Sequence, residues 1–287
     1  MYWTERRERM RALLAGDRCV HPGSVYDAVS ARIAEDLGFE VGMFAGSIGS
    51  LSVLGAPDLI TLTLTEFAAQ AYRICRAGNL SLMVDADHGY GNALNVKRTV
   101  EELETAGVSA LTIEDTVLPQ PYGEVGNTQL ISLEEGVGKM KAALAGRQDK
   151  NLIIAGRTSA VQVTGIEDAI KRAKAYQAAG VDAMFFTGIK TRPELETVAA
   201  EVKLPIFLGS IGPELADKDY LSATGVRIAL QGHQPVMAAI RATYETLKAL
   251  REGTAPRDLK GVASPELMKQ VTRDADFKRW TKEFLGG

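Results

Sequence analysis

The sequence predicts an α/β protein whose fold is a (β/α)8 barrel of the TIM type. Two observations lead to this expectation. Short runs rich in β-branched residues alternate with helical patterns of about 10 to 15 residues, and the alternation supplies eight strands. A chain of 287 residues is long enough to form one such barrel. The expected organisation is therefore a single domain over residues 1–287, with 262–287 as a C-terminal helical extension.

The eight expected strands are short apolar segments. In chain order they are Arg18–Pro22, Val41–Ala45, Leu80–Ala86, Ala110–Asp115, Leu152–Arg157, Ala183–Thr187, Ile206–Leu208 and Arg227–Leu230. A weak internal repeat supports them, because four helices are expected to end at a glycine just before a strand: Gly38, Gly107, Gly180 and Gly225. Helices commonly end in the left-handed conformation, which glycine adopts without a Cβ penalty.

The expected helices begin at capping signals. Four pairs have the spacing of a capping box: Thr63 and Glu66, Ser132 and Glu135, Thr164 and Glu167, and Thr191 and Glu194. A closed barrel is favoured over an open parallel sheet because no G-x-G-x-x-G phosphate loop follows the first strand. The segment 262–287 carries apolar residues at near-helical spacing. It must bury them against its own barrel or against a neighbouring subunit.

The composition argues against several classes of partner. With 36 acidic and 33 basic residues the net charge is −3, which does not attract nucleic acid or an anionic membrane. No segment is apolar over the roughly 18 residues that a membrane span needs, and residues 1–16 form a charged amphipathic pattern rather than a secretory signal. We therefore expect a cytoplasmic protein that binds a small molecule. The two cysteines, Cys19 and Cys75, are expected to be buried packing residues.

Acidic residues gather at the expected carboxyl ends of the strands, where barrel enzymes build their active sites. Asp85 and Asp87 end the third strand, Glu114 ends the fourth, and Asp58 lies in the loop after the second. Each acid alone is more typical of a solvated loop or a helix N-cap. Together they would repel one another unless a cation lay between them. Oxygen ligands suit Mg²⁺ or Mn²⁺, and Mg²⁺ commonly keeps several waters.

Other polar residues follow the ends of further strands. Arg157, after the fifth strand, could hold a substrate carboxylate with its planar fork or form an internal ion pair with one of the acids. His233 follows the eighth strand, and Ser47 follows the second. Tyr26, near the end of the first strand, is expected to form a wall of the pocket.

The motifs LGAPD, DADHGYGN, TIEDTVLP and AGRTSA resemble those of the isocitrate lyase and phosphoenolpyruvate mutase superfamily. The resemblance extends over about residues 27–250. It implies a (β/α)8 barrel whose C-terminal helix is exchanged between subunits, usually in a homotetramer. It also implies that Mg²⁺ binds the 2-oxo carboxylate of the substrate.

The resemblance assigns roles to residues of this chain. Asp85 would be the direct metal ligand, and three further acids, Asp58, Asp87 and Glu114, would act through water. Ser47 and Arg157 would bind the substrate carboxylate.

Two departures from the family pattern narrow the expected reaction. Superfamily lyases carry Cys-Gly-His after the strand-four motif, and here Tyr122 and Glu124 stand at those places. The loop also lacks the basic and Asn-rich character of the phosphonate-forming mutases. What remains resembles the oxaloacetate decarboxylase branch, which has N/Q-G-H at the end of the last strand; here these residues are Gln231, Gly232 and His233.

The resemblance to this branch implies a carboxy-lyase that converts oxaloacetate to pyruvate and CO₂ through an enolate stabilised by Mg²⁺. His233 and Arg157 are the expected catalytic residues, with Ser47 and Tyr26 as further substrate contacts. One alternative is a C–C bond lyase or a hydrolase that acts on another small 2-oxo or 2-hydroxy diacid. An alternative of another class is a non-catalytic barrel that binds a metabolite.

Overall fold

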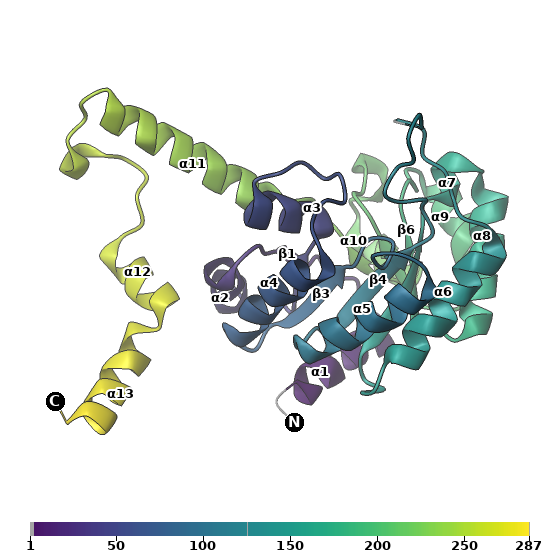
Figure 1. Ribbon diagram of the computed structural model, residues 1–287, viewed down its shortest axis with the longest axis horizontal. Helices are drawn as coiled ribbons and strands as arrows, with labels where there is room; N and C mark the ends of the chain where they lie inside the picture. Colours follow the sequence, from purple (N-terminus) through teal and green to yellow (C-terminus); the bar gives the residue numbers. More distant parts are fainter. Residues whose placement is uncertain (1–2, 125, 287) are drawn as a thin grey trace.

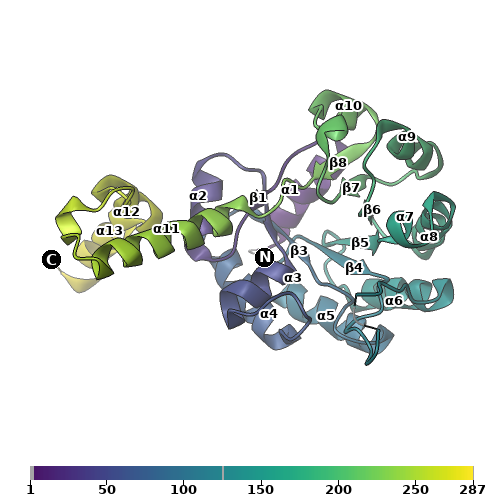
Figure 2. The same cartoon turned by 90° about the horizontal axis from the view of Figure 1, so that it is seen from above.

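The structure is a computed structural model and describes residues 3–124 and 126–286. Eight parallel strands form one sheet in the order β1 to β8, and the outer helices follow it round, which is clearest from above (Figure 2). The expected α/β fold of the TIM type is confirmed. Residues 1, 2, 125 and 287, which the single-domain prediction includes, lie outside the described residues.

The strands are short, as a barrel requires. They are β1 Gly23–Ser24, β2 Val41–Phe44, β3 Ser81–Asp85, β4 Ala110–Glu114, β5 Ile153–Thr158, β6 Ala183–Phe186, β7 Ile206–Leu208 and β8 Val226–Ala229. From the second onward, each expected strand coincides with an observed one to within about one residue at either end. Nearly all their side chains are buried, because a barrel strand faces its core on one side and helices on the other.

The helices between and after the strands are as follows. They are α1 Thr4–Ala15, α2 Ala28–Asp36, α3 Gly46–Gly49, α4 Leu64–Arg76, α5 Ala93–Thr105, α6 Leu133–Gly146, α7 Ala160–Val163, α8 Ile166–Ala179, α9 Arg192–Glu201, α10 Lys218–Ala223, α11 Gln234–Arg251, α12 Pro265–Thr272 and α13 Asp274–Leu285. A π-helical turn, Ser50–Leu54, continues α3, and 3₁₀ turns lie at Pro213–Leu215 and Pro256–Asp258.

The first expected strand, Arg18–Pro22, was placed wrongly. Strand β1 follows Pro22 and pairs with β2, whereas before Pro22 a single residue, Val20, bridges to Ile228 of β8. Val20 N donates to the carbonyl of Arg227 at 2.9 Å, and its carbonyl accepts from the N–H of Ala229 at 3.0 Å. Because Pro22 has no N–H to donate, a continuous ladder cannot cross it. The segment around Pro22 therefore contacts both neighbouring strands: Val20, before the proline, bridges to β8, and β1, after it, pairs with β2.

Most of the local signals appear as expected. Gly38, Gly107, Gly180 and Gly225 all have positive φ, between 82° and 105°. Complete capping boxes form at Thr63 and Thr191, and the hydroxyl of Ser132 accepts from the N–H of Glu135. The box expected at Thr164 is wrong, because α8 begins one residue later, after Gly165, and the Thr164 hydroxyl donates to Asp168 Oδ2 at 2.7 Å.

The two cysteines are buried and unpaired, as expected. Burial raises the pKa of the Cys19 thiol to about 11 and that of Cys75 to about 12. No helix in the described part of the chain combines the length and apolar character needed to cross a membrane.

The C-terminal segment leaves the barrel. Helix α11 projects outward, and α12 and α13 lie beyond it as an arm (Figure 1). The described arm touches its own barrel at α2, where Arg273 pairs with Asp36 at 2.7 Å and Arg32 Nη1 donates to the carbonyl of Val271 at 2.9 Å. Large apolar side chains on α11 and the arm remain exposed: Met237, Ile240, Tyr244, Leu247, Leu267, Met268, Phe277, Trp280 and Phe284.

Candidate active site

A cavity of about 660 Å³ opens at the carboxyl ends of the strands. Every predicted site residue except Tyr26 lines it: Ser47, Asp58, Asp85, Asp87, Glu114, Arg157 and His233. Tyr26 lines two neighbouring grooves beside the start of α11. This corrects the expectation that Tyr26 forms a wall of the same pocket. The physical reason is that the backbone of Tyr26 is held by the outer helices: its N–H donates to Ser30 Oγ of α2 at 2.9 Å, and its carbonyl accepts from Gln70 Nε2 of α4 at 2.8 Å.

The register of the sheet brings acid and base together. Glu114 on β4 is the direct partner of Arg157 on β5. Arg157 Nη1 donates to Asp85 Oδ2, and Arg157 Nη2 lies 3.1 Å from Glu114 Oε2. Of the two roles considered for Arg157, the structure thus shows the internal ion pair. Its buried Nε has no hydrogen-bond partner among the described residues.

The carboxylates of the cavity are poorly compensated, including Glu114 beside Arg157. Burial raises the pKa of Asp87 well above its usual value, and the charges of Asp85, Glu114 and Asp58 raise it further. For Glu114, burial outweighs the favourable charge of Arg157 and raises the pKa to about 7. The cavity therefore holds four acids against a single guanidinium, and a cation would relieve their repulsion.

The donor set fits a hydrated divalent cation. Carboxylate oxygens are the ligands that Mg²⁺ prefers, and Gly46 leaves room for one of them, because a Cβ there would lie 2.4 Å from Asp87 Oδ1. Within residues 3–124 and 126–286, no three His, Cys, Asp or Glu side chains are grouped to hold a metal ion by themselves. A cation in this cavity would therefore need oxygens of water or substrate among its ligands, as Mg²⁺ commonly does.

His233 lies at the junction of β8 and α11, where it is the N-cap residue of α11. Its Nδ1 is 2.8 Å from the hydroxyl of Ser24 on β1. Burial lowers the pKa of His233, and the charge of Asp85 partly offsets this. A neutral ring whose Nδ1 accepts from Ser24 keeps its proton on Nε2, which is then a hydrogen-bond donor.

Some residues of the site escaped the sequence reasoning. Thr112 Oγ1 donates to Asp85 Oδ1 at 3.0 Å; it lies two residues before Glu114, so the two-residue period of a strand could have found it. Ser24 was missed because β1 was placed too early. Gln120 and Phe185 also line the cavity, and the Phe185 ring lies under Arg157, 5.3 Å from the guanidinium carbon.

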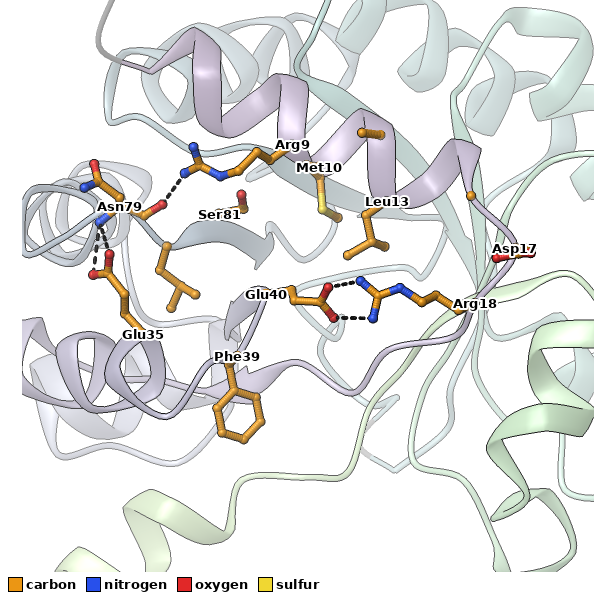
Figure 3. Close-up of a pocket in the computed structure, with 13 residues that line it drawn as sticks. Arg9, Met10, Leu13, Asp17, Arg18, Glu35, Phe39, Glu40, Asn79 and Ser81 are labelled. Carbon is orange, nitrogen blue, oxygen red and sulfur yellow. Dashed lines mark hydrogen bonds and ion pairs between the residues drawn. The ribbon is translucent and has the colours of Figure 1, made fainter.

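A second cavity, of about 550 Å³, lies near the amino-terminal ends of the strands (Figure 3). Four of its five charged side chains make bonds with their neighbours: Arg18 pairs with Glu40, Arg9 donates to the Asn79 carbonyl, and Glu35 accepts from the Asn79 N–H. The fifth, Asp17, is exposed to solvent. This cavity thus lacks the uncompensated charge of the first. In barrels of this kind the amino-terminal end serves stability rather than chemistry.

The charge imbalance predicts a specific dependence of stability on pH. In the presence of a chelator, the thermal unfolding midpoint should fall as the pH rises from about 5 to about 7. The reason is that the pKa of Glu114 is about 7 in the folded state, above the ordinary value of 4.5. Between these two values the folded state binds more protons than the unfolded state. The folded state therefore loses stability as the pH rises and Glu114 ionises.

Circular dichroism during heating measures this effect. Glu114→Gln, which cannot ionise at this position, should make the fall smaller and leave the part that comes from the raised pKa values of Asp87 and Asp58. Mg²⁺ should stabilise the wild type most at pH 7 and above. A wild-type midpoint that rises steadily from pH 5 to 7 in chelator would contradict the imbalance.

Comparison with known proteins agrees with this geometry. The model of the phosphoenolpyruvate phosphomutase family matches residues 10–251. A protein of Bradyrhizobium diazoefficiens named oxaloacetate decarboxylase is 61% identical over 286 residues, which cover 100% of this chain and 99% of the relative. The structure of oxaloacetate acetylhydrolase with the inhibitor 3,3-difluorooxalacetate is 26% identical, with a TM-score of 0.86 and coverage of 99% of this chain and 98% of that one.

A further solved structure, phosphonopyruvate hydrolase in complex with oxalate and Mg²⁺, is also 26% identical. Its TM-score is 0.84, over 98% of this chain and 99% of that one. These matches confirm the resemblance that the sequence motifs indicate. The chain belongs to the phosphoenolpyruvate phosphomutase family.

Proposed function

We propose that this protein is a carboxy-lyase that converts oxaloacetate to pyruvate and CO₂ with the help of Mg²⁺, or of Mn²⁺ in its place. The observation that carries the proposal is one cavity in which a carboxylate cluster meets Arg157 and His233. The lining of that cavity, as described, contains no cysteine, which argues against the thiol-dependent reactions of related lyases. Identity of 61% along the whole chain to a relative named oxaloacetate decarboxylase supports the same reaction.

The reaction makes a clear demand on the site. The bond between C3 and the distal carboxyl breaks, CO₂ leaves, and the electron pair remains as an enolate that takes up a proton at C3 to give pyruvate. The barrier is mainly the cost of the developing negative charge. A divalent cation, when bound, supplies the Lewis acid that stabilises this charge.

Asp85 is the proposed direct ligand of the cation, with Asp58, Asp87 and Glu114 holding its waters. Asp85 accepts three bonds, from the Thr112 hydroxyl, the Arg157 guanidinium and the backbone N–H of Asp87. They fix its orientation and still leave a lone pair for a metal, because a carboxylate has about four. Partners of this kind orient a ligand and are part of a metal site.

Arg157 and Ser47 are proposed to bind the C1 carboxylate of the substrate. The guanidinium stays charged at any ordinary pH, because Asp85 and Glu114 outweigh the effect of burial and raise its pKa. Arg157 and Ser47 line the same cavity, so the guanidinium can meet a carboxylate there. Ser47, at the start of α3, adds a hydroxyl and a neighbouring backbone N–H on the same cavity wall.

His233 is proposed to donate from Nε2 to the departing carboxylate or to the enolate oxygen. The bond between Ser24 and Nδ1 would hold the ring in the required orientation and tautomer. A group in this position acts on the reacting atoms and does not touch the cation.

Products of the purified protein test the proposal against its rivals. With Mg²⁺ and a choice of oxaloacetate, methylisocitrate, dimethylmalate or phosphonopyruvate, we expect pyruvate and CO₂ from oxaloacetate as the fastest reaction. Oxalate and acetate from oxaloacetate would indicate a hydrolase instead, and faster cleavage of another diacid would indicate a different lyase. A non-catalytic barrel would also fail to exchange the methyl protons of pyruvate with D₂O.

Two substitutions should impair the reaction in different ways. Asp85→Ala should abolish the dependence on Mg²⁺ together with activity. His233→Ala should lower kcat by roughly 10²-fold or more and leave the Mg²⁺ concentration for half-maximal activity nearly unchanged. Steady-state kinetics over a Mg²⁺ series measures both. Full kcat in His233→Ala, or an active and metal-independent Asp85→Ala, would show the assigned roles to be wrong.

We also propose that the C-terminal arm is exchanged between subunits of a homotetramer in the cytoplasm. Free cysteines suit such a reducing compartment. Helix α11 leaves an apolar stripe exposed, with Ile240 50% and Tyr244 60% exposed, and an exposed apolar patch commonly marks a surface that binds another protein. In this arrangement residues 1–287 form a single domain, and 262–287 reach a neighbouring subunit. The apolar stripe would then be covered by that subunit.

Size-exclusion chromatography with light scattering tests this assembly. The wild type should have about four times the mass of one 30.9 kDa chain, and Ile240→Glu on α11 should reduce it. The matched change Leu94→Glu, on α5 and 78% exposed, should leave the mass unchanged. A monomeric wild type, or an Ile240→Glu protein of unaltered mass, would contradict the proposal.

A further inference from the structure

The loop after β3 carries Asp87 into the acidic cavity, and its backbone is unusual. The φ of Asp87 is 47° and that of Tyr90 is 59°, in the left-handed region that L side chains rarely adopt. The Asp87 carboxylate lines the cavity and lies against Gly46, where a Cβ would be 2.4 Å from Asp87 Oδ1. Residues in this region persist only where the surrounding structure holds them, so the contacts of the loop decide where Asp87 lies.

Three consecutive backbone carbonyls of this loop each accept a hydrogen bond from a different neighbouring element, β4, α6 or α5. The three bonds run from Glu114 N to the Asp87 carbonyl at 2.8 Å, from Lys139 Nζ to the His88 carbonyl at 2.9 Å, and from Thr99 Oγ1 to the Gly89 carbonyl at 3.0 Å. The middle bond is the one that an ionisable side chain donates.

Lys139 is buried inside the layer of helices, and its side chain is costly to place there. The residue is only 3% exposed, whereas lysine is almost never fully buried unless it is paired, because its ammonium loses hydration. The hydrogen bond that the structure shows for this ammonium ends on the His88 carbonyl rather than on a carboxylate. An apolar side chain would pack at this position without the cost. The burial of an ammonium therefore indicates a use for its bond to the loop.

We propose that Lys139 is a positioning residue of the cation site, whose bond to the His88 carbonyl holds the loop so that the Asp87 carboxylate faces the cation. The inference rests on the proposed function, because it requires the cation. Lys139 lies outside the described lining of the cavity and acts through Asp87, which lines it. Partners that orient the groups around a metal commonly change its affinity by roughly 10- to 100-fold.

Lys139→Met tests the inference, because it fills most of the same space and removes the donor. Titration of the metal-free full chain with Mg²⁺ by isothermal calorimetry should give an affinity roughly tenfold weaker than that of the wild type. Lys141→Met is the matched control. Lys141 belongs to the same helix, α6, and is exposed, so its substitution should leave the Mg²⁺ affinity unchanged.

A double-mutant cycle with Asp87→Asn shows whether Lys139 acts through Asp87. Asp87→Asn alone should weaken Mg²⁺ binding. In the Asp87→Asn background, Lys139→Met should change the remaining affinity by less than about twofold, because residues that act through one another are not additive. An equally large loss in both backgrounds would show that Lys139 does not position Asp87, and would overturn the inference.

The thermal unfolding midpoint in chelator shows whether each variant is folded. Lys139→Gln also ends one bond short of the ammonium and loses the reach to His88, so it replaces Lys139→Met if the latter does not fold. Wild-type Mg²⁺ affinity in a folded variant of either kind would overturn the role of Lys139 alone. A wild-type protein that does not bind Mg²⁺ would overturn the cation site, and the role of Lys139 with it.

Discussion

The contact between Arg157 and the acids Asp85 and Glu114 is the interaction on which the site depends. One guanidinium at the end of β5 joins the last residues of β3 and β4. It compensates two of the four carboxylates, while Asp58 and Asp87 remain close by with raised pKa values. Arginine suits this position because its fork can contact two carboxylates at once and because it stays charged when buried. The residual negative charge is the feature of the cavity that would favour a bound cation.

The fold imposes this arrangement through register and loop geometry. Parallel pairing sets Glu114 beside Arg157, Arg157 beside Phe185, and Asp85 beside Thr112. The loop after β3 then turns Asp87 back to the site through left-handed backbone that few side chains adopt. At the amino-terminal ends of the strands the charged side chains have partners: Arg18 pairs with Glu40, and Glu35 accepts from the N–H of Asn79. Chemistry and stability are thus divided between the two ends of the barrel.

Sequence reasoning recovered the architecture and the residues that share the cavity, because both follow from periodic patterns and from the rule that strand ends converge. It failed where the answer depends on local steric detail. Pro22 displaced β1, and with it the positions of Tyr26 and Ser24. The pairing of Arg157 with two acids was one of two open alternatives, since register cannot be read from one strand alone. Nothing in the sequence marked the Arg157 Nε as unpaired, because pairing is a property of three-dimensional packing.

We propose that the four acids and Arg157 form the binding site of a divalent cation. Anomalous diffraction from crystals grown with Mn²⁺ tests this most directly. We predict a single strong peak in the cavity within bonding distance of Asp85, with water or substrate oxygens among its ligands. Well-ordered crystals in saturating Mn²⁺ with no peak beside Asp85, or with Arg157 filling that position, would contradict the claim.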